Sequence, residues 1–440
     1  MKNHPLKKII KFQKQHIPVG IYSACTANPF VLEACMERAL ETDSILLIEA
    51  TANQVNQYGG YTGMKPKDFV SFVKELAETV QLDEDRIILG GDHLGPLTFT
   101  QYDEEKAMEE AAELIRQYVL AGFSKIHIDT SMKVASDDPT IRLSDKIIAQ
   151  RGAYLAKVAE EAFKTYRLEH PNAMHPVYIV GSEVPIPGGS QDAVDTGVTV
   201  TKVDDFKATV KEFETAFERE NLQEAFQEVI GVVVQPGVEE KDSGCTEYDR
   251  NNAKELMASI DLYKNLVFEG HSTDYQTKIK LKELVEDGVG ILKIGPGLTF
   301  ALREALFSLA FIEKELFKNT PVKQSYFMET LDETMLENPK YFEKHYHGTS
   351  AQIALKRKYS FSDRARYYLP NEKVSASIAV LLENLKEGVP LNLLSQFMPI
   401  QYTKVREGII KNDPTVLIKD RIKNTIDDYL YATHQELLNQ

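Results

Sequence analysis

The sequence contains only three cysteines, Cys25, Cys35 and Cys245, among 440 residues. Three cysteines cannot build a disulfide scaffold or a four-cysteine zinc site. They fit free thiols in a reducing cytoplasm, where we expect the chain to be located. No stretch reaches 18 consecutive apolar residues, so we expect no membrane span. The apolar run of the basic, amphipathic N-terminus is too short and too interrupted for a signal peptide.

Basic residues are also in short supply, since 51 Lys and Arg stand against 66 Asp and Glu, a formal charge of −15. This balance argues against nucleic acid or an anionic membrane as the main partner, because both bind basic patches. The net charge does not exclude a local basic pocket that binds a phosphorylated sugar. No GxGxxG follows a strand, and neither GxxxxGK[ST] nor GxSxG occurs. These absences argue against a P-loop kinase, a bound nucleotide and an α/β-hydrolase.

What the first 300 residues do contain is a regular alternation of short apolar runs with longer helical patterns. The β-rich runs cover 19–23, 45–50, 87–91, 125–129, 177–181, 230–235, 266–270 and 291–295. The helical patterns cover 67–80, 104–120, 143–168, 201–221, 252–264 and 277–287. Near-continuous apolar runs are typical of parallel strands covered on both faces. Eight such units predict an α/β fold, a (β/α)8 TIM barrel, with a large doubly wound sheet as the alternative.

The rhythm breaks from about residue 298 onward. Helical patterns follow at 301–318, 375–386 and 415–439, and one more helix is expected before the first strand. We expect residues 1–319 to form the barrel that carries the site. Residues 320–440 are expected to form a mainly helical C-terminal extension packed on that barrel.

Polar side chains follow nearly every predicted strand, where a (β/α)8 barrel places its active site. They are Glu49, Asn53, Gln54, Asp92, His93, Asp129, Glu183, Gln235, His271 and Lys293. So many groups that are costly to desolvate, gathered on one rim, point to function. The alternative is that they are ordinary polar loop residues.

Two imidazoles and a carboxylate from separate strand ends form a typical set of ligands for a catalytic divalent metal. We therefore expect His93, His271 and Glu183 to bind a metal ion, although a lone histidine is more often structural. His127 lies inside a predicted strand and is interpreted as a buried, hydrogen-bonded structural residue. Asp92, beside His93, is expected to be a proton shuttle, with a helix cap as the alternative.

Two further features could grip a phosphate group. Glycine-rich spots at Gly59-Gly60, Gly188-Gly189 and 294–297 could bind one through backbone N–H groups, or could be turns. The segment 356–368 packs five cations into thirteen residues. Within it, Arg364 is our candidate for a bidentate contact. The alternative is the start of a surface helix, capped by Ser362.

Four strings of the sequence carry a resemblance to a known family. They are IEATANQVNQYGGYTGM at 48–64, LGGDHLGP at 89–96, GFSKIHID at 122–129 and YSFSDR at 359–364. With these strings the chain resembles the tagatose-1,6-bisphosphate aldolase Z-subunit (GatZ/KbaZ-like) family, from about residue 15 to about 435. That family is similar to class II, metal-dependent aldolases, so the resemblance also implies a (β/α)8 barrel.

The resemblance implies roles for individual residues. Asp92 matches the aldolase proton-transfer aspartate, His93 the first metal-binding histidine and His271 the later one. Asp129 matches an acid behind the metal ligands, with a catalytic role, and Glu183 a metal-associated glutamate. The chain departs from the pattern in two places. Gln235 stands where an aldolase has another metal-binding histidine, and His271-Ser272-Thr273-Asp274-Tyr275 replaces the His-Gly-Gly-Ser-Gly phosphate loop.

Family members have been described as non-catalytic stabilising subunits, as tagatose-6-phosphate kinases and as ketose 4-epimerases. The resemblance therefore implies a metal-dependent aldolase or 4-epimerase of tagatose- and fructose-type sugars or their phosphates. The alternative is a barrel subunit supporting a separate class II aldolase. We expect a divalent metal (Zn first, then Mn, Co or Ni), a sugar or sugar phosphate, and a homo-oligomer. The substrate contacts are expected from Glu49, Asn53, Gln54, Gln235, Ser272, Asp274, Lys293 and Arg364.

Overall fold

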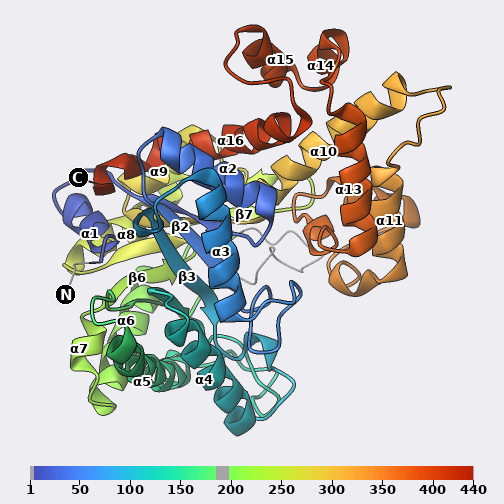
Figure 1. Ribbon diagram of the computed structural model, residues 1–440. Helices are drawn as coiled ribbons and strands as arrows, with labels where there is room; N and C mark the ends of the chain where they lie inside the picture. Colours follow the sequence, from blue (N-terminus) through green and yellow to red (C-terminus); the bar gives the residue numbers. More distant parts are fainter. Residues whose placement is uncertain (1–3, 185–197, 440) are drawn as a thin grey trace.

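A closed barrel of eight parallel strands forms the centre of the computed structural model, which describes residues 4–184 and 198–439 (Figure 1). The strands are β1 (Ile21–Cys25), β2 (Leu46–Thr51), β3 (Ile87–Leu94), β4 (Lys125–Ile128), β5 (Val177–Val180), β6 (Val229–Val234), β9 (Val267–Gly270) and β10 (Val289–Ile294). Their order around the barrel is β1-β10-β9-β6-β5-β4-β3-β2. Each overlaps one of the eight predicted runs, so the (β/α)8 prediction is confirmed.

Helices follow the strands and cover the outside of the barrel. They are α2 (Pro29–Glu41), α3 (Pro66–Val80), α4 (Glu104–Leu120), α5 (Asp145–Glu169), α6 (Val203–Arg219), α7 (Gln223–Phe226), α8 (Arg250–Ser259), α9 (Lys278–Glu286) and α10 (Pro296–Leu316). In α4 the Asp103 side chain accepts the N–H of Lys106 at the N-cap, and the apolar stripe is buried. A short hairpin of β7 (Glu239–Glu240) and β8 (Cys245–Thr246) follows β6.

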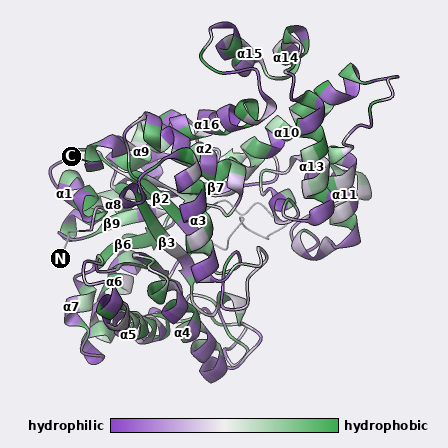
Figure 2. Cartoon of the chain, in the orientation of Figure 1, coloured by the Kyte–Doolittle hydropathy of each residue, from purple (hydrophilic) through white to green (hydrophobic). Residues whose placement is uncertain are grey.

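The N-terminal end of the barrel is filled with apolar side chains. Helix α1 (Lys7–Gln13), the helix expected before the first strand, supplies Ile9 and Ile10 to this end, next to Leu6. They pack with inward-facing residues of the strands, such as Ile21, Leu47, Ile88, Ile179, Val267 and Ile291. Figure 2 shows the strands as the hydrophobic centre and the helices as half hydrophilic. The core therefore lies below the rim where the polar residues gather.

The region after α10 is helical, as predicted. It contains α11 (Phe327–Glu337), α12 (Ser350–Tyr359), α13 (Glu372–Leu385), α14 (Leu391–Phe397), α15 (Pro399–Arg406) and α16 (Pro414–Thr433). Short 3₁₀ turns occur at Glu84–Arg86, Pro96–Thr98, Ile260–Leu262, Pro339–Tyr341, Arg364–Tyr367 and Gln435–Asn439. The last predicted helix, 415–439, ends at Thr433 because His434 turns left-handed, with φ of 47°.

Helix α16 returns from this region to the barrel. It packs against α2, α9 and α10, and the N–H of Gly20, just before β1, donates to Thr433 O at 2.8 Å. Figure 1 shows α11 and α13 at the far end of α10, away from the barrel, whereas α16 lies beside α2 and α9. The barrel wall is thus completed by the last helix of the chain.

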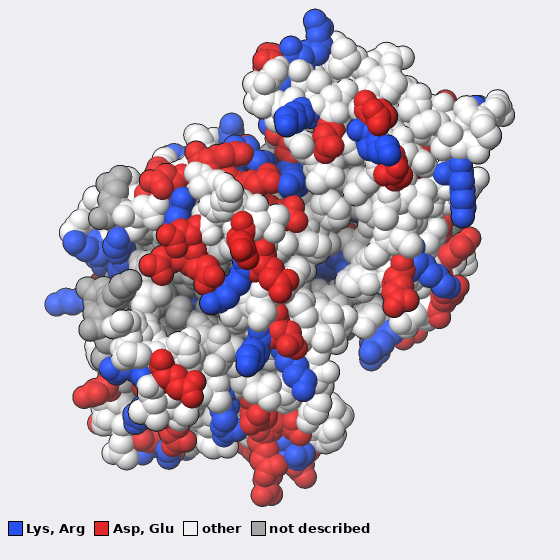
Figure 3. Space-filling view, viewed as in Figure 1, with Lys and Arg blue, Asp and Glu red and all other residues white. Residues whose placement is uncertain are grey.

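The surface follows the acidic composition. On the face in Figure 3, acidic side chains gather over the barrel, with lysines and arginines among them. Among the described residues, no helix combines the length and hydrophobicity that a membrane crossing requires. Gly188 and Gly189 lie outside the described residues.

Candidate functional site

The barrel interior changes from apolar to polar along β2, β9 and β10. Inward-facing residues are two apart, so Leu47 is followed by Glu49 in β2, and Val267 by Glu269 in β9. In β10 the same step leads from Ile291 to Lys293. The polar layer also contains Lys125, and its charged members are at most 5% exposed.

These four charges form a continuous network. Lys125 Nζ lies 2.7 Å from Glu49 Oε1 and 2.7 Å from Glu269 Oε2. Lys293 Nζ lies 2.7 Å from Glu49 Oε2 and 2.9 Å from Asp92 Oδ1. Each lysine lies between two carboxylates, and Glu49 is the carboxylate that contacts both lysines. It was predicted to contact substrate, but the structure places it beneath the pocket.

We expect Glu49→Gln to lower the free energy of unfolding by about 3–5 kcal/mol, because it leaves Lys125 and Lys293 short of a buried counter-charge. Denaturant unfolding measures the change. The control is Lys74→Ala, which breaks the exposed pair between Lys74 and Glu84 (2.8 Å) and should change stability by less than about 1 kcal/mol. Equal effects of the two variants would contradict a structural role for the network.

Three histidines lie next to this charge network. His93 lies near the end of β3, His127 in β4 and His271 directly after β9. Their ring centroids are 5.1 Å apart in all three pairs. His93 has a left-handed backbone, with φ of 51°. Two residues on, a Cβ at Gly95 would lie 1.7 Å from the Asp129 carbonyl oxygen, so only glycine lets the chain pass β4 here.

Each imidazole has one ring nitrogen next to a carboxylate. His93 Nδ1 lies 2.8 Å from Asp129 Oδ2, His127 Nδ1 2.9 Å from Asp92 Oδ1, and His271 Nε2 2.9 Å from Glu269 Oε1. A carboxylate behind an imidazole fixes its tautomer and leaves the other nitrogen as a ligand. His127 Nε2 is buried and has no hydrogen-bond partner among the described residues, while His127 Nδ1 also accepts the backbone N–H of His93 at 3.2 Å.

The histidine cluster (His93, His127 and His271) is compatible with a divalent metal in its ring spacing and in the charge around it. Three imidazoles on one tetrahedral zinc ion, with Zn–N of about 2.0–2.1 Å, have ring centres about 5.2 Å apart, close to the observed spacing. The charges also balance. Four buried carboxylates surround the cluster and two lysines offset two of them, so two negative charges remain for a divalent cation. The carboxylates are Glu49, Asp92, Asp129 and Glu269, and the lysines are Lys125 and Lys293.

A second, overlapping set of ligands exists. Single ligand atoms of Asp92, His127, Glu269 and His271 all lie within 4.8 Å of one another. Both carboxylates in this set already pair with lysines, whereas His127 Nε2 has no partner. His93 is not part of this second set.

The acids around the cluster stay ionised. Burial alone would raise the pKa of Asp92, but His93 and Lys293 beside it hold that pKa well below the usual range. Burial opposes ionisation of Asp129 as well, yet the hydrogen bond from His93 lowers its pKa to about 2. Burial lowers the pKa of His271 to about 4, which keeps its imidazole neutral and able to bind a metal near pH 7.

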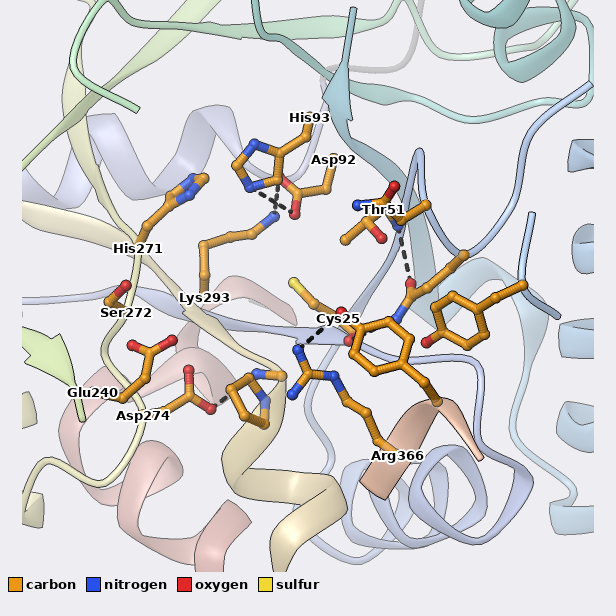
Figure 4. Close-up of a pocket in the computed structure, with 16 residues that line it drawn as sticks. Cys25, Thr51, Asp92, His93, Glu240, His271, Ser272, Asp274, Lys293 and Arg366 are labelled. Atoms are coloured by element: carbon orange, nitrogen blue, oxygen red, sulfur yellow. Dashed lines mark hydrogen bonds and ion pairs between the residues drawn. The ribbon is translucent and has the colours of Figure 1, made fainter. Parts of the chain in front are cut away.

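A pocket opens to solvent above the cluster. Figure 4 shows His93, His271 and the Lys293 ammonium group turned toward one another at one side of it, with Asp92 beside them. The lining residues are Cys25, Thr51, Asn53, Gln54, Tyr61, Asp92, His93, Glu240, His271, Ser272, Asp274, Lys293, Gly295, Pro296, Arg366 and Tyr367.

Most of the predicted substrate contacts meet in this pocket, namely Asn53, Gln54, Ser272, Asp274 and Lys293. Asp92 lies within β3 and caps no helix, since the N-cap of the following 3₁₀ turn is Gly95 and that of α4 is Asp103. The helix-cap alternative for Asp92 is therefore wrong.

Two predicted residues lie apart from the cluster. Glu183 is 30% exposed at its side chain and accepts the Thr201 hydroxyl at 2.6 Å, with Arg142 3.7 Å away. Gln235 turns back on its own loop, where its Oε1 accepts the N–H groups of Gly237 and Val238. Neither residue lines the pocket.

The C-terminal region reaches the pocket through Arg366 instead of Arg364. Arg364 is buried against His345, with Nη2 2.9 Å from His345 Nδ1, and does not line the pocket. Arg366, two residues on, lines it together with Tyr367. The turn that begins at Asp363, with φ of 44°, decides which arginine faces the site, and nothing in the sequence marks that turn.

Several site residues were missed, most notably His127 and Glu269. His127 was interpreted as structural because it lies inside a strand. His127 lies two residues before Asp129, and Glu269 lies two residues before His271. The strand period of two therefore places His127 and Glu269 on the inward face, and this spacing is the signal in the sequence that could have identified them. Glu240 and Tyr61 lie in loops and hairpins with no such periodicity.

Comparisons with known proteins identify the family of this chain. The family model of the D-tagatose-1,6-bisphosphate aldolase subunit GatZ/KbaZ-like matches residues 6–434. A solved structure described as a probable tagatose 6-phosphate kinase from Sinorhizobium meliloti 1021 is 41% identical, with a TM-score of 0.85, and covers 94% of this chain and 100% of that chain.

Two aldolases are more distant. The YdjI aldolase from Escherichia coli K12 is 12% identical, with a TM-score of 0.41, over 86% of this chain and 97% of that chain. The fructose-bisphosphate aldolase from Campylobacter jejuni is 15% identical, with a TM-score of 0.40, over 86% and 91%. Likeness at this level carries no conclusion about the site. On the family match and the 41% identity, the chain belongs to the D-tagatose-1,6-bisphosphate aldolase subunit GatZ/KbaZ-like family.

Proposed function

We propose that this chain is a divalent-metal-dependent enzyme that breaks and re-forms the C3–C4 bond of a ketose or ketose phosphate. With re-addition to the opposite face of the aldehyde, the reaction inverts C4 and interconverts fructose- and tagatose-type sugars. The observation that carries the proposal is the histidine cluster, three carboxylate-backed imidazoles 5.1 Å apart at the floor of a pocket. Zinc is the first choice, because three imidazoles suit it.

The bound metal would supply a Lewis acid that polarises the C2 carbonyl. The chain itself moves the proton. Asp92 Oδ1 is held by His127 and Lys293, while Oδ2 lies 3.7 Å from His93 Nε2, on the cluster side. In this proposal Asp92 takes the O4 proton as C3–C4 breaks, and returns it after re-addition. Burial disfavours the charged form of Lys293, yet Asp92, Glu49 and Glu269 keep its pKa well above the usual value, so its ammonium offsets the developing enediolate charge.

Side chains from the C-terminal region support retention of the aldehyde fragment. Arg366 and Tyr367 line the pocket, and Tyr61 packs on Tyr367 with ring centroids 4.8 Å apart. A fragment held under this cover can turn and re-add, whereas a fragment that escapes gives aldol cleavage. Cys25, Cys35 and Cys245 are free thiols, which supports the cytoplasm as the place of action.

The test is a conversion assay on the purified chain without any partner. The chain is stripped of metal, reloaded with Zn²⁺, Mn²⁺ or Co²⁺, and offered D-fructose, D-tagatose and their 6-phosphates. We expect about one divalent ion per chain and metal-dependent C4 inversion. The family description names a subunit, so the alternative is a supporting role for a separate class II aldolase. A metal-loaded chain that converts none of these sugars but raises the activity of such an aldolase would establish that alternative.

A further inference from the structure

One end of the pocket is built from the N-terminus of α10 and is already occupied by a side chain. Asp274 Oδ1 accepts the N–H of Gly295 at 3.0 Å and the N–H of Gly297 at 2.7 Å. These N–H groups follow β10, the eighth strand of the barrel. In (β/α)8 barrels the loops after the seventh and eighth strands and a helix N-terminus frequently bind phosphate. Here the Asp274 carboxylate already accepts the N–H groups that would otherwise bind a phosphate.

A second carboxylate stands beside the first. Glu240, from β7, is 5% exposed, lines the same pocket, and its Oε2 has no hydrogen-bond partner among the described residues. Figure 4 shows the carboxylates of Glu240 and Asp274 close together on the side of the pocket below His271 and Ser272. Burial, and next the charge of Glu240, raise the pKa of Asp274 to about 7. An unpartnered buried oxygen of this kind calls for a hydrogen-bond donor from a ligand.

The cation nearest this end does not convert it into an anion site. Arg366 Nη1 donates to the carbonyl oxygens of Ser362 and Asp363, and Nη2 donates to the Tyr367 hydroxyl. These contacts bind the guanidinium group to the chain itself, although its charge still acts on Asp274 and lowers the pKa of that carboxyl. A phosphate on the helix N-terminus would therefore face two carboxylates and no unoccupied N–H donor among those of Gly295 and Gly297.

We infer that Glu240 and Asp274 receive the free C1 hydroxyl of the ketose and exclude ketoses phosphorylated at C1. The assignment to C1 rests on the proposed function, in which the C2 carbonyl lies at the histidine cluster. C1 is bonded to C2 and reaches only groups next to the cluster. Asp274 follows His271 by three residues, and Gly295 follows Lys293 by two. A hydroxyl donates to Glu240 Oε2, whereas a phosphate dianion is repelled.

The test measures dissociation constants by calorimetry on the metal-loaded chain, with D-fructose 6-phosphate and D-fructose 1-phosphate as probes. These isomers carry the same charge and differ in which end is phosphorylated. We expect the wild type to bind the 1-phosphate about 100-fold more weakly, because like charges brought together cost several kcal/mol. Asp274→Ala frees two N–H donors and removes a charge, and should tighten 1-phosphate binding about tenfold or more.

Matched variants separate the effect of the negative charge of Asp274 from the effect of its hydrogen bonds to the N–H groups of α10. Asp274→Asn keeps an oxygen on the N–H groups and loses only the charge, so its gain should be smaller than that of Asp274→Ala. Glu240→Gln removes the second charge and leaves α10 untouched, so it serves if Asp274→Ala does not fold. Wild-type protein that binds the 1-phosphate as tightly as the 6-phosphate, or binds neither, overturns the inference. So does an unchanged 1-phosphate affinity in the folded variants.

Binding and turnover fail independently in this design. A chain that binds the 6-phosphate and rejects the 1-phosphate but converts neither upholds the inference and contradicts the proposed function. A chain that converts both isomers equally well upholds the proposed function and contradicts the inference.

Discussion

Asp92→Asn is expected to lower the turnover of ketose conversion by about 10²–10⁴ while the chain keeps its metal. Asparagine has the shape of aspartate and keeps a polar atom at the Oδ1 position, 2.9 Å from His127 Nδ1, so the histidine cluster keeps its shape. It has no basic oxygen, however, and the O4 proton then has no acceptor. Steady-state kinetics together with metal analysis of the same preparation measure the two effects separately.

Asp103→Asn is the matched control for Asp92→Asn. Asp103 is the N-cap of α4, where asparagine caps equally well, so activity, metal content and stability should all stay near wild type. Asp92→Asn with more than half of the wild-type turnover would remove Asp92 from the chemistry. Loss of metal in that variant would instead make Asp92 part of the ligand set, in agreement with its place within 4.8 Å of His127, Glu269 and His271.

His127→Ala is expected to weaken divalent-metal binding by at least about 100-fold, because replacing even the residues behind metal ligands typically weakens it by 10–100-fold. Glu183→Gln should leave metal binding unchanged, since Glu183 bonds Thr201 and stands apart from the cluster. Metal-competition titration with a chromophoric chelator measures both constants. Unfolding of the metal-free proteins shows whether His127→Ala has also lost stability.

His347→Ala is the control for the loss of a histidine as such, because His347 is exposed and far along the chain from the barrel strands. The opposite pattern, in which His127→Ala binds metal normally and Glu183→Gln does not, would restore the ligand set His93, His271 and Glu183. It would return His127 to a structural role.

Most of the architecture was predictable because strand and helix periodicities are local properties of the sequence. The eight runs and the position of the rim follow from them, and the rim contains Asp92, His93, His271 and Lys293. The ligand set did not follow, because His127 reaches the cluster from inside a strand. Its role depends on the inward orientation of β4 and on the position of His93, whose left-handed backbone no periodicity reveals.

The remaining differences come from single turns. Arg364 and Arg366 are two residues apart, and the left-handed residue Asp363 just before them directs one inward against His345 and the other to the pocket. Gln235 was predicted to be a rim residue, but its side-chain oxygen accepts hydrogen bonds from two N–H groups of its own loop. Such local hydrogen bonds compete with ligand contacts, and sequence alone does not show which of them forms.

The return of α16 to the barrel makes folding depend on the end of the chain. The eighth strand ends at Ile294, but the groove between α2 and α9 is filled only by residues 414–433. Until those residues leave the ribosome, the apolar flank of β1 has no cover. The Thr433 carbonyl that binds Gly20 N–H is also missing. A nascent chain cut near residue 319 would therefore expose an open seam beside its first strand, and a full-length chain closes it by contacts between the two ends of its sequence.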